Sequence, residues 1–341
     1  MITLLAGGVG AARLLRGLAR VVRPRDLTVI VNTGDDDEFY GLHVSPDIDT
    51  ILYTLAGLAP LERGWGIDGD TFTVRDELDR VAGRGWFALG DRDLATHIQR
   101  TRRLREGATH SEVTREMTRA RGLQVRVLPM SDDAVRTVIA TDRGDLAFQD
   151  YLVRLRARPL VRAVRYRGAR AARPAPGVLE AIASSRLVIV APSNPFVSIG
   201  PILAVPGIRR ALAAARDRVV AVSPLIGGRA VKGPLASMLK SMGRGADAGA
   251  IAKLYRDIAS IMVVAPGDAP PPVNDKTVKV RGLRASKTTT WPAGMEVVEH
   301  DILLLDPKRA ENLARHLVDR RRKGRSPRAT PPEKEKRRNR A

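Results

Sequence analysis

Five short apolar runs recur along the chain and alternate with stretches of helical pattern. They occupy residues 2–6, 27–31, 187–191, 219–223 and 261–265. Apolar runs of this length without regular polar alternation are typical of strands that are buried on both faces of a parallel sheet. We therefore predict an α/β chain with a Rossmann-like three-layer fold and a mostly parallel sheet, whose ligands bind at the carboxyl ends of the strands.

The region between about residues 60 and 170 has a different pattern. Charged amphipathic stretches predominate there, which predicts a largely helical insertion that covers one edge of the ligand site. We assign residues 1–319 to a single domain, because 44% hydrophobic residues in a chain of 341 suffice for a large core. Residues 320–341 hold eleven Lys or Arg against two Glu, so they carry +9 of the formal net charge of +21 and are predicted to form a disordered basic tail.

The composition excludes several classes of protein. The sequence contains no cysteine, which rules out disulfides and thiolate metal sites and leaves oxygen or histidine as metal ligands. No apolar run approaches the ~20 residues that span a bilayer, so we expect a cytoplasmic protein without membrane contact. Aromatic residues make up only 4% of the chain, too few for the stacking surfaces of single-stranded nucleic-acid binders, and no specific nucleic-acid partner is expected.

A glycine-rich turn follows the first apolar run. Its sequence, Gly-Gly-Val-Gly at residues 7–10, leads directly into the helical pattern AARLLRGLARVV. Glycines allow the backbone to approach a phosphate, and a helix N-terminus offers unpaired N–H groups to an anion. A tight strand-to-helix turn without any ligand explains the same residues equally well, because the spacing matches neither of the standard nucleotide-binding motifs.

The segment after the second run gathers acidic residues in a basic chain. Residues 31–50, VNTGDDDEFYGLHVSPDIDT, contain five aspartates and one glutamate. Turn chemistry explains Asp35, and favourable helix-end electrostatics explain Asp47 after the Ser45-Pro46 pair. However, both parts of the segment are expected at the ligand end of the sheet, where carboxylates would repel a phosphate unless a cation lay between them. We therefore predict a magnesium site opposite the glycine turn.

Two later loops carry further candidate ligand contacts. Ser193 and Asn194 lie in a proline-bracketed loop after the third run and have the hydrogen-bonding groups to read a base or a sugar, although the same loop can simply cap a helix. Arg229 and Lys232 lie beside glycine pairs after the fourth run, which suggests a second phosphate contact or an ordinary basic surface loop.

A turn at residues 89–97 contributes two weaker candidates. Asp91 has the position of a helix cap, and His97 is as readily explained as a structural histidine. The sequence has no Gly-x-Ser-x-Gly elbow, no Cys/His pair and no His-Glu-x-x-His segment. Covalent and zinc-dependent catalysis therefore find no support.

Several of these segments, read in order, resemble one known family. The segments include LLAGGVGAARLLRGL, VNTGDDDEFYGLHVSPDIDTILYTLAG, APSNPFVSIGPILAVPGIR and SPLIGGRAVKGP. They resemble the 2-phospho-L-lactate transferases of coenzyme F-420 biosynthesis over about residues 1–305. The resemblance implies a magnesium-dependent transfer of a 2-phospholactyl or phosphoenolpyruvyl-type group from a guanosine-diphospho donor to 7,8-didemethyl-8-hydroxy-5-deazariboflavin, with release of GMP. It also implies a homodimer.

The resemblance further implies roles for individual residues. Asp35 and Asp49 are expected to hold the Mg²⁺ ion and to be the catalytic residues, with Asp36, Asp37 and Asp47 as alternatives. The residues implied to contact the two substrates are Gly8, Val9 and Gly10 at the donor phosphates, Ser193, Asn194 and Pro195 at the guanosine, Arg229 and Lys232 at the phosphates or the acid carboxylate, and Thr50, Asp91 and His97 on the deazaflavin side.

Two other classes of function remain open at this stage. A nucleotide-sugar-binding regulator, of the related gluconeogenesis-factor-like family, has a similar glycine turn but catalyses no transfer. A nucleic-acid-binding protein is suggested by the charge of +21 alone. The acidic segment and the stretch at residues 65–68 favour the transferase.

Overall fold

The computed structural model describes residues 1–83, 85–270 and 291–323. A seven-stranded sheet with the order β14-β13-β10-β9-β1-β2-β5 forms its centre, and every neighbouring pair is parallel. Its strands are β1 (Ile2–Ala6), β2 (Leu27–Val31), β5 (Arg126–Pro129), β9 (Leu187–Val190), β10 (Val219–Val222), β13 (Ile261–Val264) and β14 (Glu296–Glu299). All five apolar runs are strands of this sheet, which confirms the predicted α/β fold.

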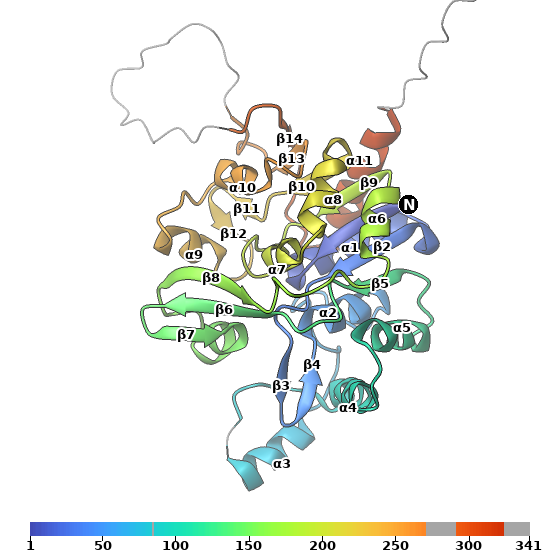
Figure 1. Cartoon of the computed structure of the whole chain (residues 1–341), viewed down its shortest axis with the longest axis vertical. Coiled ribbons are helices and arrows are strands. Elements are labelled where there is room, and N and C mark those ends of the chain that lie inside the picture. The colour runs from blue at the N-terminus through green and yellow to red at the C-terminus, as the bar shows by residue number, and fades with distance from the viewer. Residues whose placement is uncertain (84, 271–290, 324–341) are drawn as a thin grey trace, which may run out of the picture.

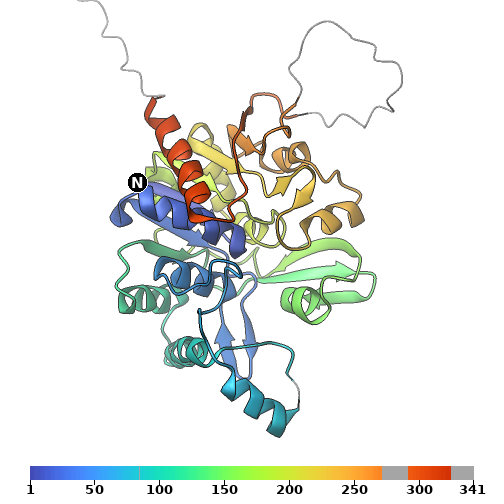
Figure 2. The same ribbon diagram turned by 180° about the vertical axis from the view of Figure 1, so that it is seen from behind.

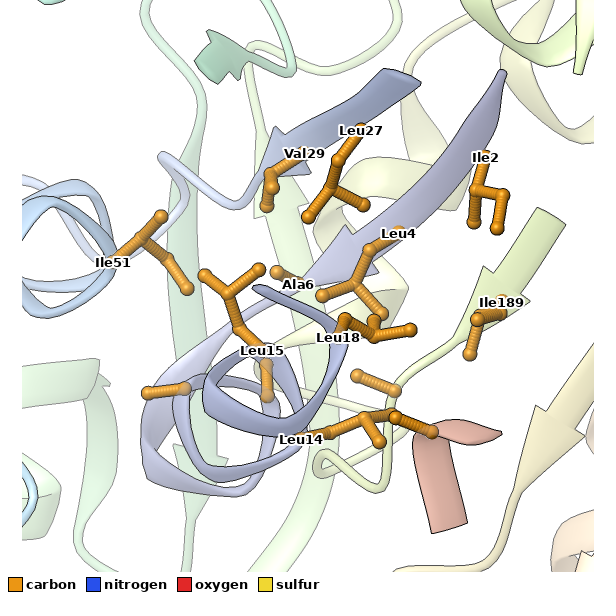
Figure 3. Close-up of a cluster of buried hydrophobic side chains, with 14 of the residues drawn as sticks. Ile2, Leu4, Ala6, Leu14, Leu15, Leu18, Leu27, Val29, Ile51 and Ile189 are labelled. Atoms are coloured by element: carbon orange, nitrogen blue, oxygen red, sulfur yellow. The ribbon is translucent and has the colours of Figure 1, made fainter. Parts of the chain in front are cut away.

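Helices cover both faces of the sheet, as Figures 1 and 2 show from opposite sides. On one face Leu14, Leu15 and Leu18 pack against side chains of β1 and β2 (Figure 3), and α11 packs beside α1 on the same side. The helices of the chain are α1 (Gly8–Val21), α2 (Pro46–Leu55), α3 (Thr73–Ala82), α4 (Asp91–Arg105), α5 (His110–Ala120), α6 (Val178–Ser184), α7 (Ile199–Ala204), α8 (Ile208–Ala214), α9 (Leu235–Ser241), α10 (Ala248–Tyr255) and α11 (Pro307–Lys323), with short turns η1 (Pro24–Asp26), η2 (Asp150–Arg154) and η3 (Arg216–Arg218).

Small antiparallel sheets extend from the body. The hairpin of β3 (Asp37–Phe39) and β4 (Leu42–Val44) projects toward α3, and a three-stranded sheet of β6 (Arg136–Thr141), β7 (Gly144–Ala147) and β8 (Val161–Arg167) lies to one side of the central sheet (Figure 1). A short pair, β11 (Leu225–Ile226) with β12 (Arg229–Ala230), completes the strands of the described part.

The prediction of a largely helical insertion at residues 60–170 is correct only for its first half. Helices α3, α4 and α5 occupy that half, but β5 belongs to the central sheet and β6 to β8 form their own sheet. The charged residues misled the prediction because β8 is mostly exposed, with partly buried positions alternating with exposed ones only toward its end, and an exposed face rich in arginine resembles the polar face of a helix.

The predicted basic tail begins later than residue 320, because α11 continues to Lys323; the remainder of that prediction lies outside the described residues. None of the described helices combines the length and the apolar character that crossing a bilayer requires.

The order of the strands fixes where a ligand pocket can form. From β1 the sheet grows in one direction to β2 and β5, and in the other to β9, β10, β13 and β14. The loops after β1 and β9 therefore leave the sheet in opposite directions and open a crevice at the carboxyl ends of these two strands.

Candidate functional site

A pocket of about 550 Å³ lies at this switch point, which is large enough for a substrate of nucleotide or flavin size. Its walls come from the turn after β1, the start of α2, the first turns of α4 and the loops after β9 and β10. The candidate residues from the sequence that line it are Gly8, Val9, Gly10, Asp35, Asp49, Thr50, His97, Ser193, Asn194 and Lys232. Residues separated by more than 200 positions thus meet in one cavity.

The glycine turn packs tightly against the loop after β9. A Cβ atom added at Gly10 would lie 2.2 Å from the carbonyl oxygen of Pro192, so no larger residue fits without movement of the backbone. Gly8 has a φ of +69°, in the left-handed region that favours glycine, and its N–H donates to Asp47 Oδ1 at 2.7 Å. The turn is therefore both a packing element, as the alternative explanation holds, and a direct neighbour of the acidic segment.

Asp35 and Asp47 form a buried acidic pair beside this turn. Asn32 donates to Asp47 Oδ2 at 2.9 Å, and Gly34 N donates to the amide oxygen of the same asparagine at 2.8 Å, which holds the two segments together. Burial raises the pKa of Asp47 to about 6. Burial, followed by the charge of Asp47, raises the pKa of Asp35 well above its ordinary value.

The acidic pair fits a hard cation. Both carboxylates are more than nine-tenths buried, and Oδ1 of Asp35 has no hydrogen-bond partner among the described residues. Two adjacent carboxylates in one pocket repel each other unless a proton or a cation neutralises them, and Mg²⁺ prefers oxygen ligands of this kind. Asp35 and Asp47 thus offer the oxygen donors that a magnesium site requires, and the magnesium itself stays a prediction.

Asp49, the other metal ligand that the resemblance implies, is paired with an arginine. It forms an ion pair with Arg100 of α4, with Nη1 at 3.0 Å from Oδ2 and Nη2 bonded to Oδ1, and both side chains are buried. The physical reason is helical geometry: Asp47 and Asp49 are two residues apart in α2, and positions i and i+2 of a helix point in different directions. The other two alternatives, Asp36 and Asp37, are not part of the pocket lining.

A network of hydrogen bonds and close charged contacts extends from this ion pair along the pocket wall. Tyr53 Oη donates to Asp93 Oδ1 at 2.5 Å, His97 Nε2 lies 3.2 Å from the same oxygen, and His97 Nδ1 lies 3.3 Å from Arg100 Nη1. Thr50 lines the pocket one turn before Tyr53. Sequence reasoning missed Tyr53, Asp93 and Arg100, although the spacing of Asp93, His97 and Arg100 at i, i+4 and i+7 indicates one helix face.

Asp91 lies outside the pocket lining and caps a helix instead. Its carboxylate accepts hydrogen bonds from Thr71 Oγ1 at 2.6 Å and from the N–H groups of Thr73 and Val74 at 3.0 Å each, all at the start of α3. The hydrogen bond from Thr71, together with those from the backbone, lowers the pKa of Asp91 to about 2. The expected contact with a substrate gives way to the capping role.

The later loops contribute only part of the expected set. Ser193 and Asn194 line the pocket, but Asn194 Oδ1 accepts from the N–H of Phe196 at 2.9 Å and so also shapes the loop. Pro195 and Arg229 are not part of the lining. Lys232 is, and its Nζ donates to the carbonyl oxygen of Arg63 at 2.6 Å, which links the loop after β12 to the loop after α2.

Several aromatic side chains line the pocket, which sequence reasoning also missed. Phe87 stacks on Phe39 with ring centroids 3.7 Å apart, behind the pocket surface. The aromatic residues in the lining are Tyr53, Trp65, Trp86, Phe87 and Phe148. These five are a large share of the thirteen aromatic residues in the chain, so the low aromatic content conceals a local concentration suited to a planar ligand.

The chain matches a known protein family and several characterised relatives. The model of the 2-phospho-L-lactate transferase CofD family matches residues 2–312. The chain is 48% identical over 259 residues to a phosphoenolpyruvate transferase of Streptomyces griseus, covering 74% of this chain and 81% of the relative. It is 43% identical over 264 residues to a 2-phospho-L-lactate transferase of Methanothermobacter thermautotrophicus, covering 77% and 84%.

A solved structure supports the fold alone. Protein BH3568 of Bacillus halodurans superposes with a TM-score of 0.56 at 17% identity, covering 93% of this chain and 98% of that one. The family match and the two relatives confirm the resemblance read from the sequence and the expectation of an enzyme. The chain belongs to the 2-phospho-L-lactate transferase CofD family.

Proposed function

We propose that the chain transfers a phosphoenolpyruvyl-type group from a guanosine-diphospho donor to 7,8-didemethyl-8-hydroxy-5-deazariboflavin, with release of GMP and with Mg²⁺ as cofactor. Membership of the family is consistent with a transferase of coenzyme F-420 biosynthesis. The choice of the enolpyruvyl group over 2-phospholactyl follows the name of the relatives at 47–49% identity, whereas the 2-phospho-L-lactate transferases match at 38–43%.

The buried pair of Asp35 and Asp47 is the observation that carries the proposal. In the proposed site these two carboxylates hold the Mg²⁺ ion, since they offer oxygen ligands next to the glycine turn. The ion supplies neutralisation of the negative charge on the donor phosphates. Asp49 has a different role in this scheme: its charge is already balanced by Arg100, so it serves as a fixed hydrogen-bond acceptor in the pocket wall.

Two cations on the other side of the glycine turn suit the donor phosphates. Arg13 and Lys232 both line the pocket, and Arg13 Nε is buried without a hydrogen-bond partner among the described residues. Burial lowers the pKa of Arg13; burial, with the neighbouring charges of Arg13 and Arg63, lowers that of Lys232. Cations that destabilise one another are stabilised by an anion, so a diphosphate between them relieves the repulsion.

The reaction then requires mainly that the acceptor hydroxyl is aligned with the phosphorus of the donor. In this scheme the aromatic side chains of the pocket hold the deazaflavin ring. The ribityl hydroxyl of the deazaflavin attacks the phosphorus that bears the three-carbon acid. A bond forms between the hydroxyl oxygen and that phosphorus, the bond from phosphorus to the GMP oxygen breaks, and GMP leaves. In this scheme the cation engages both carboxylates of the pair, so the hydroxyl proton passes to solvent water.

Product analysis tests this function. Purified protein is incubated with the deazaflavin, Mg²⁺ and either the enolpyruvyl or the phospholactyl guanosine-diphospho donor, and the products are separated and identified by mass. We expect GMP and the enolpyruvyl product in equal amounts, and a rate reduced by about 10²-fold or more in Asp35→Asn. Asp37→Asn is the matched control, because Asp37 belongs to the same acidic segment but lies outside the pocket lining.

The outcomes separate the alternatives. If only the phospholactyl donor gave a product, the proposed donor would be wrong, but the proposed transferase activity would stand. No product with either donor, together with saturable binding of a nucleotide sugar, would overturn the proposal in favour of a binding protein.

A further inference from the structure

A second cluster of polar side chains lies outside the pocket lining and has no part in the proposed reaction. Asp36 directly precedes β3, His43 lies in β4, and His110 is the first residue of α5. His43 Nε2 lies 3.2 Å from Asp36 Oδ2, and His110 Nε2 lies 3.4 Å from the same oxygen. One ligand atom of each of the three residues lies within 4.8 Å of the others.

These separations match those of ligands around one small metal ion. Zinc binds imidazole nitrogen and carboxylate oxygen at about 2.0–2.2 Å, so two ligand atoms in a tetrahedral site lie about 3.4 Å apart. The two distances to Asp36 Oδ2 agree with that value. The carboxylate oxygen therefore already lies at the ligand-to-ligand separation of such a site from each of the two imidazole nitrogens.

Hydrogen bonding alone leaves this cluster incomplete. Ser45 Oγ lies 2.8 Å from Asp36 Oδ2 and 3.0 Å from His110 Nε2, so three groups surround one carboxylate oxygen. The other oxygen, Oδ1, is buried and has no hydrogen-bond partner in the part of the chain that the structure describes. A cation bound by both oxygens of this carboxylate would also give Oδ1 a partner.

The electrostatic environment of the cluster is compatible with a bound cation. His110 is buried beside the carboxylate of Asp36, whose negative charge attracts a cation. The charges that act on His110 are those of Asp36 and Asp132, which favour a cation, and of Arg100 and His43. The charge of Arg100 is balanced by its ion pair with Asp49.

We propose that Asp36, His43 and His110 bind a transition metal ion, with zinc as the best match, which joins the β3–β4 hairpin to the start of α5. Two imidazoles and one carboxylate suit zinc, whereas magnesium prefers oxygen ligands only. The site is therefore distinct in chemistry from the Asp35–Asp47 pair. Because Asp36 follows Asp35, and Ser45 lies two residues before Asp47, the ion would also fix the spacing of the two segments that carry the acidic pair.

Cobalt is a suitable probe, because Co²⁺ occupies such sites and its visible absorption reports the ligands. The full chain, stripped of metal, is titrated with Co²⁺ in excess Mg²⁺, and Zn²⁺ content is measured separately by mass spectrometry after dialysis. We expect one ion per chain, visible absorption bands of a four-coordinate site, and displacement of Co²⁺ by Zn²⁺. In His43→Ala the affinity should fall by at least about tenfold.

The controls separate this site from adventitious binding. His43 is partly exposed, so its replacement is expected to leave the fold intact, which circular dichroism checks. The double variant His300→Ala/His316→Ala removes the other histidine pair, whose ring centroids lie 4.6 Å apart, and should bind Co²⁺ like the wild type. Binding that His43→Ala leaves unchanged, binding lost in the double variant, or no stoichiometric binding would each overturn the proposal.

Discussion

The stability of the metal-free protein should fall as the pH rises through the titration of Asp47. Burial raises the pKa of this carboxyl from 3.8 to about 6, so between these values the native state binds a proton that the unfolded state has released. The stability that this carboxyl contributes is therefore fully present below pH 3.8 and is lost as the pH rises through about 6. A difference of about two pKa units corresponds to about 3 kcal/mol of unfolding free energy.

Urea denaturation at a series of pH values from about 4 to 7, in EDTA, measures this effect. Asp47→Asn removes the titrating group. As the pH rises over this range, the free energy of unfolding of the variant, relative to that of the wild type, should therefore increase by about 3 kcal/mol. The substitution also removes the charge that helps to raise the pKa of Asp35, so it weakens the pH dependence of that neighbour in the same direction, and it disturbs the hydrogen bond from Asn32, which shifts the whole curve. Asp37→Asn should follow the wild type. Parallel curves for wild type and Asp47→Asn would refute the reasoning.

Three further predictions concern other residues. Arg100→Leu leaves Asp49 as a buried unpaired carboxylate and should cost about 3–5 kcal/mol in urea denaturation; adding Asp49→Asn should restore part of this, and a single-variant loss below about 1 kcal/mol would contradict a buried ion pair. Gly10→Ala forces its Cβ against the carbonyl of Pro192 and should lower both the melting temperature and the activity, by about 1–3 kcal/mol in stability; an unchanged melting temperature would show that the loops part easily. Asp91→Ala removes the cap of α3 and should lower the melting temperature slightly without changing the deazaflavin affinity; a weakened affinity would return Asp91 to the substrate site.

Most of the central sheet could be predicted from the sequence, and two strands could not. The five apolar runs are buried on both faces, so their composition alone identifies them. Strands β5 and β14 begin with charged residues, and each has only a short apolar part. Their pairing with β2 and β13 depends on positions about 100 and 35 residues away in the chain, which a local pattern does not contain.

The candidate site divides in the same way. The glycine turn, Asp35 and the loop at Ser193 were found because they follow strands, and parallel strands end at one edge of the sheet. The choice between Asp47 and Asp49 depended on the direction of each side chain in α2. The role of Arg100 depended on the tertiary contact that brings its side chain to Asp49 of α2.

The sequence by itself determined the class of the fold, the edge of the sheet at which ligands bind and the family, because strand composition and the residues after each strand are local properties of the chain. Only the tertiary structure decided which carboxylates share the pocket, which one is neutralised by an arginine, and which aromatic side chains line the pocket. These properties depend on the distances and burial of side chains from separate elements, and electrostatic energies change steeply with both.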